Sequence, residues 1–253
     1  MRLTFLGTGT SQGIPVIGSK HPVCLSADSK DKRMRTSAYL EIDGKSLVFD
    51  TGPDFRAQML NNNIDKLDAV LFTHEHKDHT AGFDDIRPFN FMQKRDMPVY
   101  CSARVAKALK NDYAYVFEAN KYPGAPGAVI HEIENKPFEI DGVDITPIEV
   151  MHMKMPVFGF RIKDLTYITD AKSIGDKEMN KIKGSKVLVL NCLRVEEHYS
   201  HFNLQEALDL VEKLQPKRAY FTHISHLLGF HEEVSKQLPP NIQLAYDGLQ
   251  IEI

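Results

Sequence analysis

The stretch Thr73-His74-Glu75-His76-Lys77-Asp78-His79 places four candidate metal ligands within six residues. It directly follows the apolar run Ala69–Phe72, whose length and composition predict a buried strand. Imidazole and carboxylate groups are the ligands that suit zinc, manganese and iron. A loop that opens where a buried strand ends can direct several side chains to one point. The stretch therefore predicts a metal site at the edge of a sheet.

Three further candidate ligands follow predicted strands in the same way. A single histidine or aspartate at a strand end is usually a solvated turn residue, but three of them after an H-x-H-x-D-H motif indicate a common site. They are His152 after Val143–Met151, Asp170 after Leu165–Thr169, and His223 after Ala219–Phe221.

The remaining pattern alternates short apolar runs with amphipathic segments. The best-defined helix is Leu204–Leu214, with apolar residues on one face, Asn203 as N-cap and Pro216 as a stop. Many strands with interspersed helices favour sheets covered by helices on their outer faces, with two doubly wound domains as the alternative. Other predicted strands are Leu3–Leu6, Ala38–Ile42, Leu47–Phe49, Val99–Cys101, Phe158–Ile162, Val187–Leu190 and Ile242–Ala245; other predicted helices are Asp54–Asn61 and Ala103–Lys110.

Composition excludes several classes of function. The 253 residues include 31 Lys and Arg against 34 Asp and Glu, a balance that argues against a general nucleic-acid binder. No apolar run is long enough to span a membrane, and the N-terminus lacks the pattern of a signal peptide. Three cysteines form no disulfide framework, so we expect a cytoplasmic protein with reduced thiols.

Taken together, these motifs resemble the metallo-β-lactamase superfamily. The resemblance covers essentially the whole chain as one domain, residues 1–253, and includes the Gly-rich start Gly7–Gly13 and the strand end Phe49-Asp50-Thr51-Gly52. It implies an α/β fold of the four-layer αββα sandwich type. It also implies a ligand set: His74, His76 and His152 for one metal, Asp78, His79 and His223 for the second, and Asp170 as the bridge.

Asp50 has two interpretations. The resemblance implies that it orients the ligand loop by hydrogen bonds, and the alternative is a carboxylate that caps its own turn.

The opening T-G-T-S-Q-G-I-P and the later T-H-I-S-H look most like the cyclic phosphodiesterase branch, which includes the enzyme that opens ribosyl 1,2-cyclic phosphate. That branch typically carries Cys-x-Cys-x-x-Cys near its start, and these thiolates form a structural zinc site with a later histidine. Here the first two cysteines are replaced by Ser19 and His21. The candidate ligands for an extra zinc are therefore His21, Cys24 and His226, and without zinc His226 is free to face the substrate.

The resemblance implies chemistry at a phosphodiester. Two Zn²⁺ or Mn²⁺ ions, balanced by Asp78, Asp170 and a bridging hydroxide, leave about one net positive charge for an anionic phosphate. Asp78 can orient the hydroxide. His201 is the candidate proton donor to the leaving oxygen, with a solvated loop histidine as the alternative. Arg194 is a candidate phosphate ligand.

We therefore expect a metal-dependent hydrolase, a phosphodiesterase acting on a small cyclic or nucleotide-like phosphodiester, with a homodimer as the default assembly. A thioester or lactone hydrolase is the main alternative, because the same metal site serves those reactions. A tRNA-processing nuclease is disfavoured by the short, nearly neutral loop Lys121–Ala128, and a non-catalytic carrier by the full ligand set.

Overall fold

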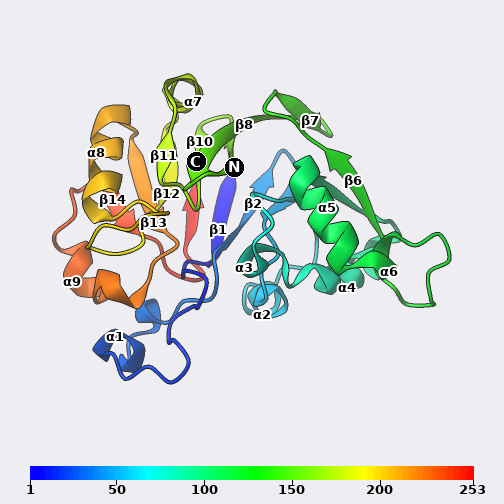
Figure 1. Ribbon diagram of the computed structural model, residues 1–253, viewed down its shortest axis with the longest axis horizontal. Helices are drawn as coiled ribbons and strands as arrows, with labels where there is room; N and C mark the ends of the chain where they lie inside the picture. The colour runs from blue at the N-terminus through cyan, green and yellow to red at the C-terminus, as the bar shows by residue number, and fades with distance from the viewer.

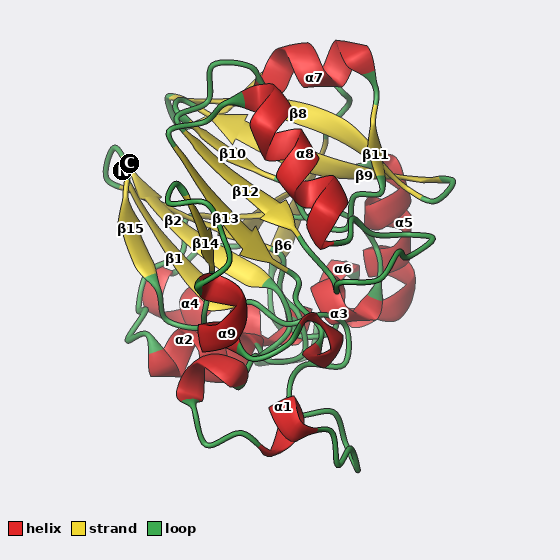
Figure 2. Cartoon of the chain, turned by 90° about the vertical axis from the view of Figure 1, so that its left-hand side faces the viewer, coloured by secondary structure: helices red, strands yellow, loops and turns green.

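Two β-sheets face each other in the computed structural model, which describes all 253 residues, and helices cover both outer faces (Figure 1). The predicted four-layer αββα sandwich is confirmed. Figure 2 shows the strands lying between α7 and α8 on one side and α2 and α4 on the other. No helix combines the length and apolarity needed to cross a bilayer, and all three cysteines are free and buried.

The first sheet has seven strands. Its β1–β2–β3 part is antiparallel and its β3–β4–β5–β6 part is parallel. Asp43 and Gly44 connect β2 to β3 with φ of +50° and +76°, as a two-residue hairpin turn requires. The order across the sheet is β15 (Gln250–Glu252), β1 (Arg2–Gly7), β2 (Ser37–Ile42), β3 (Lys45–Phe49), β4 (Ala69–Leu71), β5 (Met97–Cys101) and β6 (Ala128–Glu132).

The second sheet begins antiparallel and continues with four parallel strands, β10, β12, β13 and β14. β7 (Phe138–Ile140) pairs with β8 outside the main path. The order is β11 (Ser173–Ile174), β8 (Val143–His152), β9 (Met155–Ile162), β10 (Leu165–Tyr167), β12 (Val187–Asn191), β13 (Arg218–Thr222) and β14 (Ile242–Leu244).

Three apolar cores hold the layers together. One fills the space between the sheets, where Phe49 of β3 stacks on Tyr167 of β10 with ring centroids 4.5 Å apart. The second lies under α7 (Asp176–Ile182), α8 (Leu204–Leu214) and α9 (His231–Ser235). The third packs the first sheet against α2 (Phe55–Asn61), α4 (Arg87–Gln93), α5 (Ala103–Asp112) and α6 (Ala114–Phe117). Two four-residue helices, α1 (Pro22–Leu25) and α3 (Lys77–Thr80), lie in loops.

The Phe49–Tyr167 stack brings two strand ends together, because Asp50 follows β3 and Asp170 follows β10 by three residues. Gly52 allows the chain after β3 to approach α3 closely. A Cβ at this position would lie 2.2 Å from the carbonyl oxygen of Asp78 in α3, so the chain after β3 contacts the ligand loop only with glycine there.

Candidate metal centre

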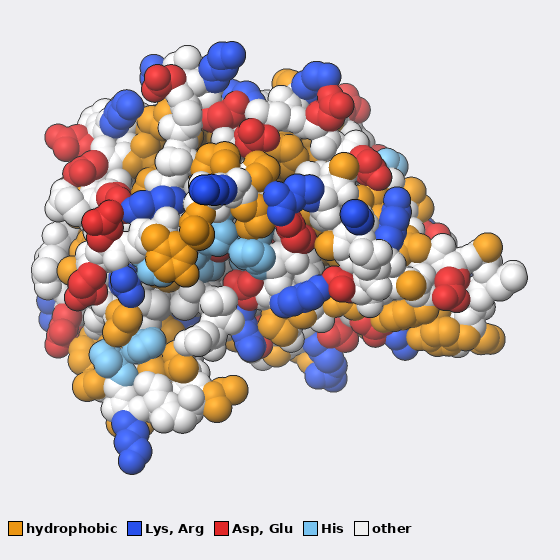
Figure 3. Space-filling view, viewed as in Figure 1, with side chains coloured by type: hydrophobic (Ala, Val, Ile, Leu, Met, Phe, Trp, Pro, Cys, Tyr) orange, Lys and Arg blue, Asp and Glu red, His pale blue; other side chains and the backbone are white.

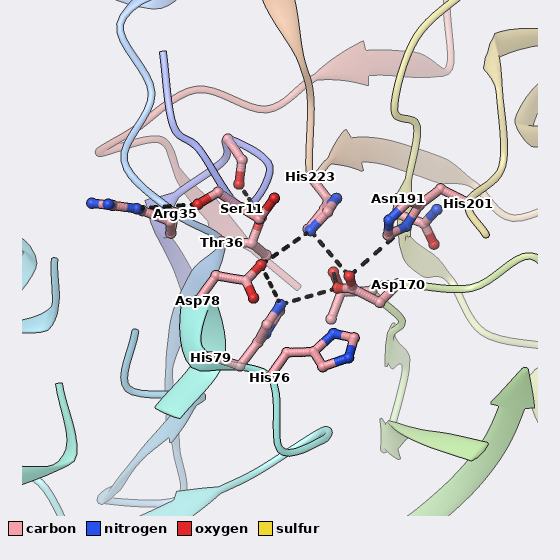
Figure 4. Close-up of polar contacts among 12 residues, drawn as sticks. Ser11, Arg35, Thr36, His76, Asp78, His79, Asp170, Asn191, His201 and His223 are labelled. Atoms are coloured by element: carbon pink, nitrogen blue, oxygen red, sulfur yellow. Dashed lines mark hydrogen bonds and ion pairs between the residues drawn. The ribbon is translucent and has the colours of Figure 1, made fainter. Parts of the chain in front are cut away.

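The structure brings all seven predicted ligand side chains to the place where the ends of the two sheets meet. Figure 4 shows His76, Asp78, His79, Asp170 and His223 converging there. Five of the seven, all except His74 and His79, line a cavity of about 300 Å³. Figure 3 shows histidine side chains gathered in a hollow near the middle of this face. The cavity is lined by Thr10, Ser11, His76, Asp78, His152, Asp170, Leu193, His198, Tyr199, Ser200, His201 and His223.

Four of the predicted ligands form one compact group: Asp78, His79, Asp170 and His223. Their ligand atoms lie within 4.8 Å of one another. His79 Nε2 is 3.3 Å from Oδ2 of Asp78 and 3.3 Å from Oδ2 of Asp170. His223 Nε2 is 3.1 Å from Oδ1 of Asp170. The group contains the three residues expected for one metal together with the expected bridge.

Asp170 also belongs to a second group, with His152 and His201. His201 Nδ1 lies 3.8 Å from Oδ1 of Asp170, and the rings of His152 and His201 have centroids 4.6 Å apart. His74 and His76 adjoin this group: the centroid of His76 is 5.3 Å from that of His152 and 4.6 Å from that of His74. His201 therefore lies beside two of the expected ligands, Asp170 and His152.

Three of the histidines are held by Nδ1, which leaves Nε2 free to face the other ligands. Nδ1 of His79 bonds to Asp50, Nδ1 of His152 bonds to the carbonyl oxygen of Ser200 at 2.9 Å, and Nδ1 of His74 bonds to Thr73. Nε2 of His74 is buried without a hydrogen-bond partner, and the buried Nε2 atoms of His79 and His223 face only the carboxylates of Asp78 and Asp170. Buried nitrogens left unpaired in this way fit divalent cations, and the nitrogen and oxygen donors suit either zinc or manganese.

Asp50 is fully buried and bonds to the ligand loop rather than only to its own turn. Its two oxygens accept from the backbone N–H and the hydroxyl of Thr73, both at 2.8 Å, and from Nδ1 of His79 at 2.7 Å. These contacts have the geometry of an orienting carboxylate.

The nearby carboxylates raise the pKa of some histidines of the site, whereas burial lowers the pKa of others. Burial lowers the pKa of His79, but Asp170, Asp78 and Asp50 together outweigh burial and raise it well above its usual value. For His223 the same balance raises the pKa to about 9. Burial instead dominates at His74, whose pKa is lowered well below its usual value. His79 and His223 therefore carry the protons that a cation must displace.

Three site residues have left-handed backbone, which is uncommon for side chains other than glycine. Asp50, Asp170 and His223 have φ of +63°, +56° and +55°. Each stands just after a strand, where the turned backbone directs its side chain into the site. Strain of this kind persists where the surrounding structure fixes the conformation.

Asn191, at the end of β12, was not predicted as a site residue. Its buried amide accepts from the backbone N–H of Ala171 at 2.8 Å and donates to the carbonyl oxygen of Ala171 at 3.0 Å. That carbonyl also accepts from the N–H of Phe202, so Asn191 joins the turn after Asp170 to the segment of His201. The only sequence signal is a buried polar residue at the end of an apolar strand.

Arg194 is not among the residues that line the cavity. Its Nη2 donates to the carbonyl oxygen of Glu197 at 2.7 Å and its Nε to that of Glu196 at 3.3 Å. The guanidinium therefore braces its own loop, and the structure does not place it as the phosphate ligand that the sequence suggested.

The candidate structural zinc ligands do not form a third cluster able to hold a metal, because both such clusters lie at the main site. The rings of His21 and His226 do meet, with centroids 4.9 Å apart. However, Nδ1 of His21 accepts from the N–H of Val23 and caps α1, and Cys24 packs in a small apolar cluster with Ile14 and Val23. Cys24 and His21 thus have packing and capping contacts of their own, and a zinc held by all three residues stays a prediction.

Comparisons with known proteins identify the family of this chain. The family model described as the beta-lactamase superfamily domain matches residues 45–224. A relative from Porphyromonas gingivalis (strain ATCC BAA-308 / W83), named octanoyltransferase, is 38% identical over 99% of this chain and 51% of its own length. This chain thus spans about half the length of that relative.

Solved structures are similar over the whole chain. A crystal structure described as a new diphosphatase from the PhnP family has a TM-score of 0.93 at 38% identity, and the match covers 100% of this chain and 97% of the other. The Zn²⁺-bound PqqB of Methylobacterium extorquens has a TM-score of 0.82 at 18% identity over 100% of both chains, which shows likeness of fold alone.

We predict that Asn191→Ala weakens zinc binding by roughly 10- to 100-fold, the usual cost of losing a group that orients metal ligands. The variant leaves the N–H of Ala171 buried without a partner and frees the turn that carries Asp170. Competition with a chromogenic chelator measures the affinity. Asn241→Ala, at an exposed asparagine, is the matched control. Unchanged zinc affinity in a folded Asn191→Ala protein would show that the clamp does not position the site.

We also predict that zinc affinity rises with pH up to about 9, where His223 loses its proton. A ligating imidazole must be neutral, so zinc displaces about two protons at pH 7, from His79 and His223. Calorimetry of zinc binding in buffers with different ionisation enthalpies counts these protons. Equal affinity at pH 6.5 and pH 9, with no proton release, would contradict the assignment.

Proposed function

This chain belongs to the metallo-β-lactamase superfamily, and from that premise we propose that it is a metal-dependent hydrolase that cleaves phosphodiester or diphosphate bonds in small anionic substrates. Two divalent cations, zinc or manganese, are the proposed cofactors. The observation that carries the proposal is the placement of His201, a buried imidazole beside the shared carboxylate of Asp170.

His201 matters because a leaving alkoxide needs a proton. Its ring is 8% exposed and faces the same cavity as Asp78 and Asp170, so a bond held at the metal centre lies within its reach. A positioned imidazole that transfers a proton in this way contributes typically 10²- to 10⁴-fold to a rate. The likeness to a PhnP-family diphosphatase supports phosphorus as the centre attacked.

The cavity suits a charged substrate. Its lining is polar apart from Leu193 and Tyr199, and Thr10 and Ser11 of the Gly-rich start add hydroxyl groups at the rim. When bound, the cations supply positive charge for the phosphate and lower the pKa of a water towards ~7. Asp78 and Asp170 offset part of that charge and hold their histidine partners in place.

The protonation of His201 depends on the substrate. Burial, together with the nearby His223, lowers the pKa of His201 to about 2, so its imidazole is neutral before substrate binds. A phosphate anion beside it raises this pKa, because an opposite charge favours the imidazolium. The cations act in the opposite direction, so proton donation by His201 requires the substrate anion to outweigh both burial and the cations.

Acyl chemistry is the second candidate, since the relative from P. gingivalis is named octanoyltransferase. Covalent acyl transfer needs a nucleophile such as a cysteine thiolate or lysine amine in the site. The cavity lining contains no cysteine or lysine, its hydroxyl groups are those of Thr10, Ser11, Tyr199 and Ser200, and burial raises the pKa of the Cys192 thiol. A largely polar cavity of about 300 Å³ also offers little apolar surface to an octanoyl chain. These observations favour phosphoryl over acyl substrates.

A substrate panel tests the proposal. We expect the zinc- or manganese-loaded protein to hydrolyse bis(p-nitrophenyl) phosphate, a 2′,3′-cyclic nucleotide or a nucleoside diphosphate ester, and to leave S-lactoylglutathione and a lactone intact. Removal of the metals by a chelator should abolish turnover. Hydrolysis of the thioester or lactone, with none of the phosphorus substrates cleaved, would favour the alternative.

The role of His201 predicts a dependence on the leaving group. His201→Ala should slow cleavage of an alkyl phosphodiester by roughly 10²- to 10⁴-fold. Cleavage of a p-nitrophenyl ester should change much less, since that leaving group departs without a proton. Metal content is measured in parallel, and His131→Ala, an exposed histidine stacked on Tyr100, is the control. Equal loss with both leaving groups would assign His201 to metal binding instead.

A further inference from the structure

Tyr199 is the exposed aromatic residue at the rim of the candidate metal centre. Its side chain is 70% exposed, yet it lines the same cavity as Asp78, Asp170 and His201. One face of its ring stacks on His198, with centroids 4.4 Å apart and planes inclined by 30°. With one face covered and 70% of the residue exposed, the other face is available to a ligand.

The stack continues from Tyr199 towards the metal ligands. His198 stacks on His201 with centroids 5.3 Å apart, and His201 in turn lies 3.8 Å from the carboxylate of Asp170 and stacks on His223. A row of rings therefore leads from the molecular surface to the place where a phosphate would be held. In Figure 3 hydrophobic side chains adjoin the hollow that contains the histidines.

The loop that carries Tyr199 is braced from both sides. Arg194 donates to the carbonyl oxygens of Glu196 and Glu197 before it. After it, the backbone N–H and hydroxyl of Ser200 bond to Nδ1 of His198.

The same loop is tied to the metal centre. The carbonyl oxygen of Ser200 accepts from His152, and the N–H of Leu193 donates to the carbonyl of Phe202. The loop backbone is thus tied to the ligands and the Tyr199 ring stacks on His198, contacts that lower the entropy cost of recognition.

We propose that Tyr199, supported by His198, stacks on the nucleobase of a nucleotide substrate whose phosphate lies at the metal centre. The inference rests on the proposed function for the phosphate and extends it to the substrate class. The site offers a candidate anion-binding centre at one end and an exposed aromatic face at the other. A nucleotide joins those two groups in one small molecule, and every nucleobase presents a π-face to such a platform.

Binding of two phosphate monoesters to the zinc-loaded protein tests the platform without turnover. AMP and ribose 5-phosphate share the sugar phosphate, and only AMP carries a base. We expect calorimetry to show AMP bound roughly 5- to 150-fold more tightly, the range that stacking on an aromatic side chain provides. Tyr199→Ala should remove this preference and Tyr199→Phe should keep it, with ribose 5-phosphate unaffected by either. Tyr122→Ala, at a tyrosine that is 51% exposed beside Tyr115 and outside the cavity, should change nothing.

Three outcomes overturn the platform: equal affinity for the two ligands, a base preference that survives in Tyr199→Ala, or no measurable AMP binding. Each is distinguishable from failure of the proposed function, which shows as thioester or lactone hydrolysis without cleavage of any phosphorus substrate. AMP binding through Tyr199 in a protein that cleaves no phosphorus substrate would keep the platform and reject the proposed reaction.

Discussion

The buried carboxylate of Asp50 is the interaction on which the candidate metal centre depends. Its oxygens accept from the backbone and hydroxyl of Thr73 and from Nδ1 of His79, so one residue joins the end of β3 to the loop after β4 and to α3. The hydroxyl of Thr73 lies 2.9 Å from Nδ1 of His74, so it orients the His74 ring as well. Two histidines therefore present Nε2 to the cavity because of one carboxylate, which burial and these donors keep in a single orientation.

The ligands of the second sheet are oriented by neutral hydrogen-bonding groups, and no carboxylate takes the part there that Asp50 has on the first sheet. Instead the side-chain amide of Asn191 clamps the backbone after Asp170, and the backbone carbonyl of Ser200 holds His152. The two halves meet because Phe49 and Tyr167 stack across the interior close to the strand ends. Packing between the sheets thus sets the separation of the ligands, and local hydrogen bonds set their directions.

The fold, and the convergence of the candidate ligands, were predictable from sequence because their signals are local. The H-x-H-x-D-H loop and the ligands after strands could be recognised from short patterns, and α8 begins and ends where Asn203, Glu206 and the following Pro216 indicate. The pairing of β15 with β1 was not predictable, since it joins the two ends of the chain. Nor was the clamp of Asn191 or the bracing by Arg194, because their partners are backbone atoms placed by tertiary structure. The packing of Cys24 against Ile14 and Val23 likewise could not be predicted from sequence spacing.

The left-handed backbone at Asp50, Asp170 and His223 has an evolutionary consequence. Such conformations cost a residue other than glycine of order 1 kcal/mol each, and the two aspartates add buried charge. The candidate metal centre therefore lowers the stability of the fold, and the three apolar cores offset that cost. A descendant released from selection for turnover would gain stability by exchanging these positions for glycine or neutral side chains. Members of this fold that have kept their cores and lost these ligands are thus an expected product of drift towards a sturdier scaffold that serves binding alone.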